Sequence, residues 1–452
     1  MVDRLVRAGM DVARLNFSHG TPAEHAQRVA AVRRASGNHE KPVAILGDLQ
    51  GPKIRTGKLT GGAKITLRVG QRFVITTQNL LGDAEGVSTT FQQLPEAVKR
   101  GDRILLSDGE IALRVESTQG RRVICRVENG GELGEHQGIN LPGVKLKIPS
   151  LTPKDRKDLL VALRLGVNYI ALSFVRSARD VKAAKAAIAH ARKTTPIIAK
   201  LEKPEAIDNL DEILSVADGV MVARGDLGVE MHPEQVPVVQ KQIISRARNA
   251  LVPVITATQM LDSMTQNPRP TRAEASDVAN AIFDGSDALM LSGETAVGRY
   301  PIESVEMMDR IIREAESSIA EPLRPARFTE LHINETIAEA ICHAAEELHM
   351  KAIAVFTETG SSARLVSKYR PRAPIIAFSP NQETRRRLTL FWGVRPRSIH
   401  RLTNVDVLVE TTEKRLLEEK IVRRGDVIGI ISGTPLGRSG TTNMMRLHRI
   451  GE

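Results

Sequence analysis

Short apolar stretches alternate with longer amphipathic segments along most of this chain. The apolar stretches have the length and composition of buried β-strands, and the segments between them have helical periodicity. Strands that alternate with helices form parallel sheets with helical crossovers. Residues 1–10 are read as the end of a helix capped by Gly9, and residues 21–36 as a second helix. Seven strands are predicted in this part of the chain, at residues 12–17, 43–48, 169–174, 197–202, 220–223, 254–258 and 288–291.

Two segments depart from this alternation. Residues 60–147 contain short alternating strands separated by Gly, Asp and Asn, which is typical of a small β domain inserted after the second strand. An insertion there lies over the face of a parallel barrel where active sites form, so we expect a lid; a passive decoration is the alternative. Beyond the proline-rich residues 321–325, a helix at 335–348 predicts a small open α/β domain. Its predicted strands are residues 352–356, 375–378 and 427–431.

Polar side chains gather at the carboxyl ends of the predicted strands, whose bodies are apolar. Lys200 and Glu202 stand two positions apart, so both side chains point to the same face of their strand. A strand-end salt bridge would explain these two residues alone, but polar residues recur at all seven strand ends. Because burying charge costs free energy, this clustering indicates a functional site. The polar residues at the other ends are Arg14, Asn16, Ser18, His19, Asp48, Ser173, Arg224, Gly225, Asp226, Thr258, Ser292, Gly293 and Glu294.

Composition narrows the classes of function. The 452 residues are 41% hydrophobic and 26% charged, as expected for a globular protein of two or three domains. The net charge of +11 suggests an RNA-binding protein as one alternative, but aromatic residues make up only 3%, too few for base-stacking platforms. Phosphorylated small molecules explain a basic surface equally well. No apolar run predicts a membrane span or signal peptide, and two distant cysteines, Cys125 and Cys342, fit a reducing cytoplasm.

The side chains at the strand ends suit phosphoryl transfer. Glu202 and Asp226 offer the hard oxygen ligands that Mg²⁺ prefers. Arg14 has the planar fork that binds phosphate. Lys200 can neutralise charge that develops on a transferred phosphoryl group or on an enolate oxygen. The glycine-containing turn at residues 223–228 is expected to open a short helix, whose free amides would suit a substrate carboxylate.

Six motifs resemble pyruvate kinase, and they occur in the family's order across nearly the whole chain. They are VARLNFSHG at 12–20, GPKIRTG at 51–57, AKLE at 199–202, MVARGDLG at 221–228, ATQMLDSM at 257–264 and LSGETA at 291–296. The resemblance implies a (β/α)₈ TIM barrel, a mobile inserted β-barrel lid and a C-terminal α/β effector domain, usually in a homotetramer. It also implies transfer of the phosphoryl group of phosphoenolpyruvate to ADP, which gives pyruvate and ATP in the cytoplasm.

On this resemblance the barrel comprises residues 1–58 and 147–325, the lid residues 59–146, and the effector domain residues 326–452. The family's barrel has eight strands, and the first of them has no counterpart among the seven predicted here. We interpret this as a start that lies downstream of the true one. An open barrel is the alternative, and it would expose two strand edges.

The resemblance also assigns roles to individual residues. Lys200 is the implied transition-state stabiliser, Thr258 the hydroxyl beside the enolate carbon, and Glu202 and Asp226 the ligands of Mg²⁺ or Mn²⁺. Asp108 is the implied lid residue nearest the site. The residues implied around phosphoenolpyruvate are Arg14, Lys200, Gly225, Asp226 and Thr258. The residues implied around the nucleotide phosphates are Asn16, Ser18, His19, Arg55 and Lys154.

One departure from the family pattern concerns a monovalent cation. Many members carry Glu where this chain has Lys53, and they hold K⁺ through counterparts of Asn16, Ser18, Asp48 and the Leu49 carbonyl. Lys53 resembles the potassium-independent branch, in which the ammonium replaces the ion. The charges agree, because the ammonium group of Lys53 and K⁺ are both monovalent cations. A solvated lysine at the lid hinge is the alternative.

A loop in the third domain is expected to bind an effector. It follows a predicted strand and starts a helix, a position that suits phosphate, although an ordinary Ser/Thr helix cap looks similar. The bases that grip a second phosphate in members regulated by fructose bisphosphate are not evident near residues 401–408. We therefore expect a monophosphate such as AMP or a sugar phosphate. The loop residues are Thr357, Thr359, Gly360, Ser361 and Ser362.

The sequence thus predicts a cytosolic pyruvate kinase that needs no K⁺ and binds neither nucleic acid nor membrane. Two alternatives stay open. A catalytically impaired relative would result if the missing first strand misplaced Arg14. A non-enzymatic RNA-binding protein is suggested by the net charge alone.

Overall fold

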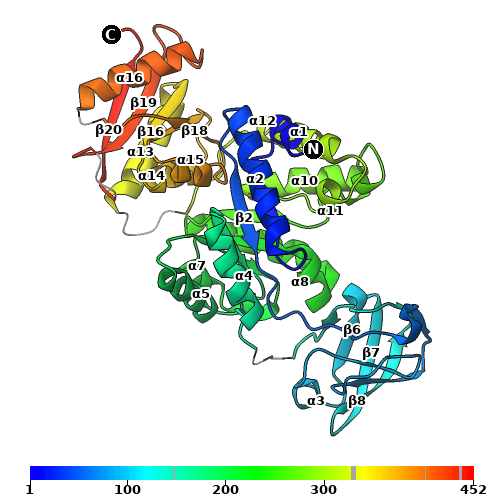
Figure 1. Cartoon of the computed structure of the whole chain (residues 1–452). Helices are drawn as coiled ribbons and strands as arrows, with labels where there is room; N and C mark the ends of the chain where they lie inside the picture. The colour runs from blue at the N-terminus through cyan, green and yellow to red at the C-terminus, as the bar shows by residue number, and fades with distance from the viewer. Residues whose placement is uncertain (145, 147, 327–331, 403, 437–439) are drawn as a thin grey trace.

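A parallel sheet forms the centre of the computed structural model, which describes residues 1–452 apart from 145, 147, 327–331, 403 and 437–439 (Figure 1). Among the described residues this sheet has seven strands in the order β1-β2-β11-β12-β13-β14-β15, and all neighbours are parallel. The seven predicted strands are therefore confirmed, with their ends shifted by one or two residues. The strands are β1 Val12–Asn16, β2 Ala44–Asp48, β11 Tyr169–Leu172, β12 Ile197–Leu201, β13 Gly219–Ala223, β14 Val254–Ala257 and β15 Ala288–Leu289.

Helices connect these strands and cover one face of the sheet. Four of them begin with a capping box, in which a threonine or serine side chain and an acidic side chain three residues later satisfy the first free backbone amides. The helices are α1 Val2–Ala8, α2 Pro22–Asn38, α4 Pro153–Arg164, α5 Ala178–His190, α6 Pro204–Asp208, α7 Leu210–Leu214, α8 Arg224–Glu230, α9 Val236–Asn249, α10 Arg272–Asp284, α11 Gly293–Ala296 and α12 Pro301–Ser317. Gly9 caps α1 at a φ of 127°, as predicted.

Alternate strand residues pack into two separate apolar clusters. Ile197 and Ala199 of β12 pack among the helices, whereas Ile198 faces Met221 in the cluster on the other side of the sheet. Burial of one such isoleucine stabilises the fold by about 1.5–3 kcal/mol. Leu390 of the third domain completes the second cluster. The strand bodies are thus apolar on both faces, and polar side chains are left to the strand ends.

β1 and β15 are the edge strands of this sheet, and no ladder of hydrogen bonds joins them within the part of the chain that the structure describes. Helix α1 packs against both α2 and α12, which follow the two edge strands. The helical layer therefore continues across the gap that the sheet leaves open.

The inserted domain is a separate β structure that projects from the barrel (Figure 1). Its main sheet has the strand order β10-β6-β7-β8-β4-β5, and a second sheet pairs β3 with β9. Phe73, Ile104 and Leu113 are fully buried in its core. Its predicted end at Lys147 lies outside the described residues. Its elements are β3 Ile65–Leu67, β4 Arg72–Thr76, β5 Gly86–Ser88, α3 Leu94–Ala97, β6 Arg103–Leu106, β7 Ile111–Gln119, β8 Arg122–Asn129, β9 Gly131–Leu133 and β10 Ile139–Asn140.

The third domain is an α/β unit with the strand order β18-β17-β16-β19-β20, in which only β20 is antiparallel. The three predicted strands are confirmed. Two more, β18 and β20, escaped prediction because both contain polar and charged residues in place of an apolar run. The elements are α13 Ile333–Glu347, β16 Ala352–Phe356, α14 Ser361–Lys368, β17 Ile375–Ser379, α15 Gln382–Leu388, β18 Val394–Ser398, α16 Val405–Glu418, β19 Val427–Gly433 and β20 Thr442–Arg449. None of the described helices in the chain combines the length and hydropathy needed to cross a bilayer.

A buried ion cluster joins the third domain to the barrel. Asp287, just before β15, accepts hydrogen bonds from Lys368 Nζ at 2.7 Å and from the Val254 backbone N–H at 2.8 Å. Arg370 Nη2 lies 3.5 Å from the second oxygen of Asp287. Burial lowers the pKa of both Lys368 and Arg370, and Asp287 opposes that shift. One carboxylate therefore compensates two buried cations.

Asp287→Ala is expected to lower the free energy of unfolding by about 3–5 kcal/mol, because it leaves both cations buried without an anion. Urea denaturation followed by circular dichroism measures this change. The matched control is Asp309→Ala, which removes an exposed ion pair with Arg313 and is expected to cost about 0–1 kcal/mol. Equal, small losses in the two variants would contradict the structural role of Asp287.

Candidate active site

The ammonium group of Lys200 lies among carboxylates at the end of β12. Its Nζ atom is 2.7 Å from Glu202 Oε1 and 3.4 Å from Asp48 Oδ1, and it donates to Ser173 Oγ at 2.9 Å. Burial on its own would lower the pKa of Lys200, but Asp48, Glu202 and Asp226 outweigh it and raise the pKa above its ordinary value. Lys200 therefore stays charged at the centre of this cluster. The strand-end ion pair of Lys200 and Glu202 thus lies within the candidate site.

Glu202 follows β12 and is 1% exposed. Its Oε2 atom accepts a hydrogen bond from the Phe174 backbone N–H at 2.8 Å. Burial raises the pKa of Glu202 to about 7, with Lys200 acting against this shift and the negative charge of Asp226 adding to it. Two carboxylates that repel each other in a buried place are stabilised by a cation between them.

The neighbouring strands β1 and β2 contribute a second ion pair to the cluster. Arg14 Nε donates to Asp48 Oδ2 at 2.6 Å, and the Arg14 side chain stays 25% exposed. Within the described chain Asp48 Oδ1 has no hydrogen-bond partner, and Lys200 is its nearest cation at 3.4 Å. Ser173 Oγ donates to the Leu49 carbonyl at 2.8 Å. Asp48 thus links Arg14, through Oδ2, to Lys200, which faces Oδ1 without a hydrogen bond.

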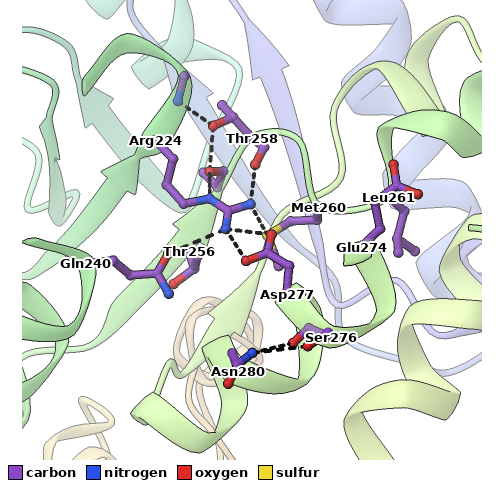
Figure 2. Close-up of polar contacts among 12 residues, drawn as sticks. Arg224, Gln240, Thr256, Thr258, Met260, Leu261, Glu274, Ser276, Asp277 and Asn280 are labelled. Atoms are coloured by element: carbon purple, nitrogen blue, oxygen red, sulfur yellow. Dashed lines mark hydrogen bonds and ion pairs between the residues drawn. The ribbon is translucent and has the colours of Figure 1, made fainter. Parts of the chain in front are cut away.

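The turn after β14 places Thr258 beside the start of α8. Thr258 has a φ of 69° and Gln259 a φ of 52°, so two residues with side chains adopt the left-handed region in succession. The Thr258 hydroxyl donates to the Ala257 carbonyl at 2.6 Å and accepts the Gly225 backbone N–H at 2.8 Å. Thr258 therefore occupies one amide of the turn at residues 223–228, whose free amides were predicted to suit a substrate carboxylate. Figure 2 shows this turn above the guanidinium group of Arg224.

The inserted domain contacts the barrel close to this cluster. Asn140 Nδ2 at the end of β10 donates to Glu230 Oε1 at 2.9 Å, and Lys203 Nζ lies 2.6 Å from the same oxygen. Arg55 lies on the segment that enters the inserted domain, and its Nη1 donates to the His136 carbonyl at 2.9 Å. Arg55 is thus held by the lid in this conformation.

A cavity of about 60 Å³ lies between the two domains and is lined by Asp226, Asp108 and Lys53. It has room for only a few water molecules. Lys53 is exposed here and forms no ion pair with Asp48 or with any other described residue. The Asp226 side chain likewise has no hydrogen bond or ion pair within the described ranges. Its oxygens are free to bind a ligand.

The remaining predicted nucleotide residues lie around the loop after β1. Ser18 donates its backbone N–H to Asn16 Oδ1 at 3.0 Å. Lys154 Nζ donates to the Phe17 carbonyl at 2.8 Å, which brings α4 to the same loop. His19 is exposed at its tip. The structure therefore brings four of the five predicted residues together, and Arg55 stands apart with the lid.

The side chains of the predicted effector loop bond within the loop and to Thr442 of β20. Gly360 has a φ of 94° and donates its N–H to Thr357 Oγ1 at 2.9 Å. Thr359 Oγ1 donates to Ser361 Oγ at 3.3 Å. Ser362 Oγ and Thr442 Oγ1 are 2.6 Å apart. Gly360 is the N-cap of α14, and no side chain in the described structure bonds the first free amides of that helix. The ordinary Ser/Thr cap is therefore not found, and the effector site stays a prediction.

One buried network near the site carried no recognisable sequence signal. Arg224 Nη1 lies 2.7 Å from both oxygens of Asp277, and 53 positions of sequence separate the two residues. Gln240 Oε1 accepts from the same guanidinium at 3.5 Å. Arg224 falls inside a recognised motif, but Asp277 looks like any polar position on an amphipathic helix. Only the packing of α10 against α9 and against the turn after β14 makes them partners.

The possible metal donors are few. The described residues contain no cluster of three His, Cys, Asp or Glu side chains arranged to hold an ion. Glu202 and Asp226 remain; both raise the pKa of Lys200, and Asp226 adds to the raised pKa of Glu202. A pair of carboxylates completed by substrate oxygens and water is how Mg²⁺ is usually held. The donor set therefore fits a divalent cation that binds together with a phosphorylated substrate.

Comparison with known proteins agrees with this geometry. Residues 1–305 match the family described as "Pyruvate kinase, barrel domain", and residues 335–448 match "Pyruvate kinase, alpha/beta domain". A pyruvate kinase of Mycobacterium tuberculosis is 46% identical over 458 residues, which cover 100% of this chain and 95% of that protein. A pyruvate kinase of Geobacillus stearothermophilus is 45% identical over 460 residues, with 100% and 78% covered.

A solved structure of a pyruvate kinase has the same fold as this chain. The crystal structure of a pyruvate kinase from Cryptosporidium parvum superimposes with a TM-score of 0.93 at 38% sequence identity, covering 99% of this chain and 92% of that one. The match includes the barrel, the inserted domain and the third domain. On the full-length identity and the shared fold, the chain belongs to the pyruvate kinase family of phosphotransferases and acts in glycolysis.

Proposed function

We propose that the cluster around Lys200 carries out the family's reaction, the transfer of a phosphoryl group from phosphoenolpyruvate to ADP. The observation that carries this proposal is a single ammonium group, buried and kept charged by three carboxylates at the open ends of parallel strands. A fixed cation in a water-poor site stabilises charge that develops during transfer. Arg14, paired through only one nitrogen and 25% exposed, is placed to bind the phosphoryl oxygens.

The reaction balances with these groups in place. An oxygen of the ADP β-phosphate attacks phosphorus, a new P–O bond forms, and the bond from phosphorus to the enol oxygen breaks. The electron pair stays on the enolate, where Lys200 neutralises it. A proton from water is then added at carbon 3 to give pyruvate. We propose that Thr258 faces this carbon and orders the proton delivery, and that the turn at Gly225 receives the substrate carboxylate.

We further propose that Glu202 and Asp226 hold Mg²⁺, or Mn²⁺ in its place. The free side chain of Asp226 and the raised pKa of Glu202 support this assignment. When bound, the ion draws electron density from the phosphoryl and enolate oxygens. Glu202 keeps its bond to the Phe174 amide, so its position does not depend on the metal.

The nucleotide is proposed to bind between the loop after β1 and the inserted domain. Asn16, Ser18, His19 and Lys154 surround the loop, and Arg55 would join them from the lid. A cavity of about 60 Å³ lies beside Asp226 and Asp108 at the inserted domain, and we expect that domain to move when the substrates bind.

Lys53 is proposed to replace K⁺ beside the transferred phosphoryl group. Support comes from Asp48 Oδ1, which accepts no hydrogen bond among the described residues, and from an ammonium group on Lys53 that lacks an ion pair there. Asn16, Ser18 and the Leu49 carbonyl would complete the site when the lid moves. The positive charge that K⁺ would otherwise supply would then belong to the protein itself.

The activity of the unmodified chain is accordingly expected to be independent of K⁺. The activity of Lys53→Glu is expected to rise by about tenfold or more when K⁺ is added, because a charge in a water-poor site acts through a low effective dielectric. Steady-state rates in tetramethylammonium buffer, with and without KCl at matched ionic strength, measure this. Lys58→Glu, an exposed lysine further into the lid segment, is the control for charge reversal. Strong K⁺ activation of the unmodified chain would overturn the proposal.

The loop at Thr357, Thr359, Gly360, Ser361 and Ser362 is proposed as a monophosphate effector site for AMP or a sugar phosphate. Glu358, 3.6 Å from Arg401, makes a ligand with two phosphate groups less suitable. We also propose that the protein is a cytoplasmic homotetramer. Each chain is proposed to divide into domains at the predicted boundaries. Two buried free cysteines fit a reducing compartment.

The test of this function is ATP formation from phosphoenolpyruvate and ADP in a coupled assay, beside an RNA-binding titration. Mg²⁺-dependent turnover with no saturable RNA binding is expected. Saturable RNA binding without turnover would favour the basic-protein alternative, and binding of phosphoenolpyruvate without turnover would identify an impaired relative.

A further inference from the structure

We propose that Arg224 and Asp277 form a positioning pair that fixes the hydroxyl of Thr258 for the protonation half of the reaction. The pair acts through the backbone of the turn after β14 and touches no substrate itself. This inference rests on the proposed function of Thr258. Figure 2 shows the pair beneath the turn, with Gln240 and Met260 beside it.

The turn that holds Thr258 is strained. Thr258 at a φ of 69° is a β-branched residue in the left-handed region, where such residues are rare, and Gln259 follows at 52°. Each residue in such a region costs about 1–3 kcal/mol and persists only where its surroundings impose it. Some contact must therefore hold this turn in place.

The contacts that do so converge on one side chain. Arg224 Nη2 donates to the Thr258 carbonyl at 2.6 Å, and Nε donates to the Ala257 carbonyl at 3.3 Å. The two carbonyls flank the α-carbon of Thr258, so one rigid guanidinium group fixes the peptide planes on both sides of it. A lysine could not reach both acceptors, because its ammonium is a point charge without a planar fork.

Asp277 holds the guanidinium group from the other side. Both of its oxygens lie 2.7 Å from Arg224 Nη1, and Asp277 belongs to α10, an element separate from the turn and from α8. The Arg224 side chain is 12% exposed and Asp277 is 35% exposed. Gln240 of α9 adds a longer bond at 3.5 Å. The orientation of Arg224 is thus set by two helices of the barrel wall.

The same residue also begins the helix that carries the metal ligand. Arg224 is the first residue of α8, Gly225 donates its amide to Thr258 Oγ1, and Asp226 comes next. Arg224 therefore ties the Thr258 hydroxyl to the segment of Asp226. The alternative is a salt bridge that only stabilises the fold, and this alternative predicts no preference for one half-reaction.

The experiment compares Asp277→Ala and Asp277→Asn with the unmodified chain. Asp277→Ala is expected to lower kcat by about 10–100-fold while KM for phosphoenolpyruvate changes less than about threefold, since small misplacements near reacting atoms have effects of this size. Asp277→Asn, which keeps one acceptor, is expected to lose less. The matched control is Asp211→Asn, which breaks an Asp–Arg pair with Arg246 between α7 and α9, away from the site. It is expected to leave kcat unchanged.

Two further readouts separate positioning from stability. Exchange of the carbon-3 protons of pyruvate in D₂O with Mg²⁺ and ATP, followed by NMR, reports removal and return of the proton alone. It is expected to fall by the same factor as kcat in Asp277→Ala. Binding of Mn²⁺, followed by electron paramagnetic resonance, reports the metal site and is expected to stay unchanged. Loss of Mn²⁺ binding along with exchange would show general collapse and overturn the proposal.

A double-mutant cycle gives the sharpest test. If Arg224 acts through Thr258, Arg224→Lys should cost as much as Asp277→Ala in the unmodified background and nothing further in Thr258→Ala. Full additivity would overturn the proposal. If Arg224→Lys does not fold, Asp277→Asn takes its place in the cycle. Failure of the proposed function would look different, because the unmodified chain would then form no ATP at all.

Discussion

Lys200→Met is expected to lower kcat by at least about 10²–10³-fold while the chain still folds. Removal of one preorganised charge contact has effects of this size, and Lys200 is the central cation of the site. Methionine fills a similar volume but leaves Asp48 and Glu202 buried without their shared partner. We therefore expect a lower melting temperature as well, although the fall in kcat is the larger effect. The measurement is steady-state ATP formation beside a circular dichroism melt.

The matched control for this variant is Lys368→Met. Lys368 is also a fully buried lysine paired with a carboxylate, at 2.7 Å from Asp287, but it lies at the junction with the third domain. Its loss should lower the melting temperature and largely spare kcat. A well-folded Lys200→Met chain with near-normal turnover would refute the role of Lys200, and so would an equal loss of rate in Lys368→Met.

Asp226→Asn is expected to raise the Mg²⁺ concentration for half-maximal activity by about tenfold or more, with little change in melting temperature. Asp226 has no structural partner within the described residues, so only the ion loses a ligand. Glu202→Gln should show the same metal effect with a larger change in stability, because Glu202 is 1% exposed and bonds both Lys200 and the Phe174 amide.

Mg²⁺ titrations of activity, with Mn²⁺ binding as an independent measure, distinguish a ligand from a scaffold. Ser263→Ala serves as a control, since its hydroxyl bonds Glu274 at the start of α10 and lies outside the cluster. If both carboxylate variants melted earlier yet kept a normal Mg²⁺ response, the carboxylates would be structural and the metal assignment would fail.

The sequence by itself determined the elements and the inventory of reactive groups. Apolar runs bounded by polar residues predicted every strand of the barrel sheet, because strands buried on both faces need apolar side chains at successive positions. The same rule explains why two strands of the third domain were not predicted: β18 and β20 contain charged residues in place of an apolar run. Parallel strands end at a common edge, so Lys200, Glu202 and Arg14 could be assigned to one site before any coordinates existed.

Only the tertiary structure decided which of these groups act on each other. Asp48 binds Arg14 and also faces Lys200, and Thr258 takes the amide of Gly225 that local reasoning had left free. Such pairings depend on strand register and on side-chain direction, and a local hydrophobic pattern contains no information about either. Arg224 and Asp277 show this most clearly, since periodicity places each on its own element and says nothing about the other. The packing of α10 against α9 and the turn after β14 makes them neighbours, although 53 positions of sequence separate them.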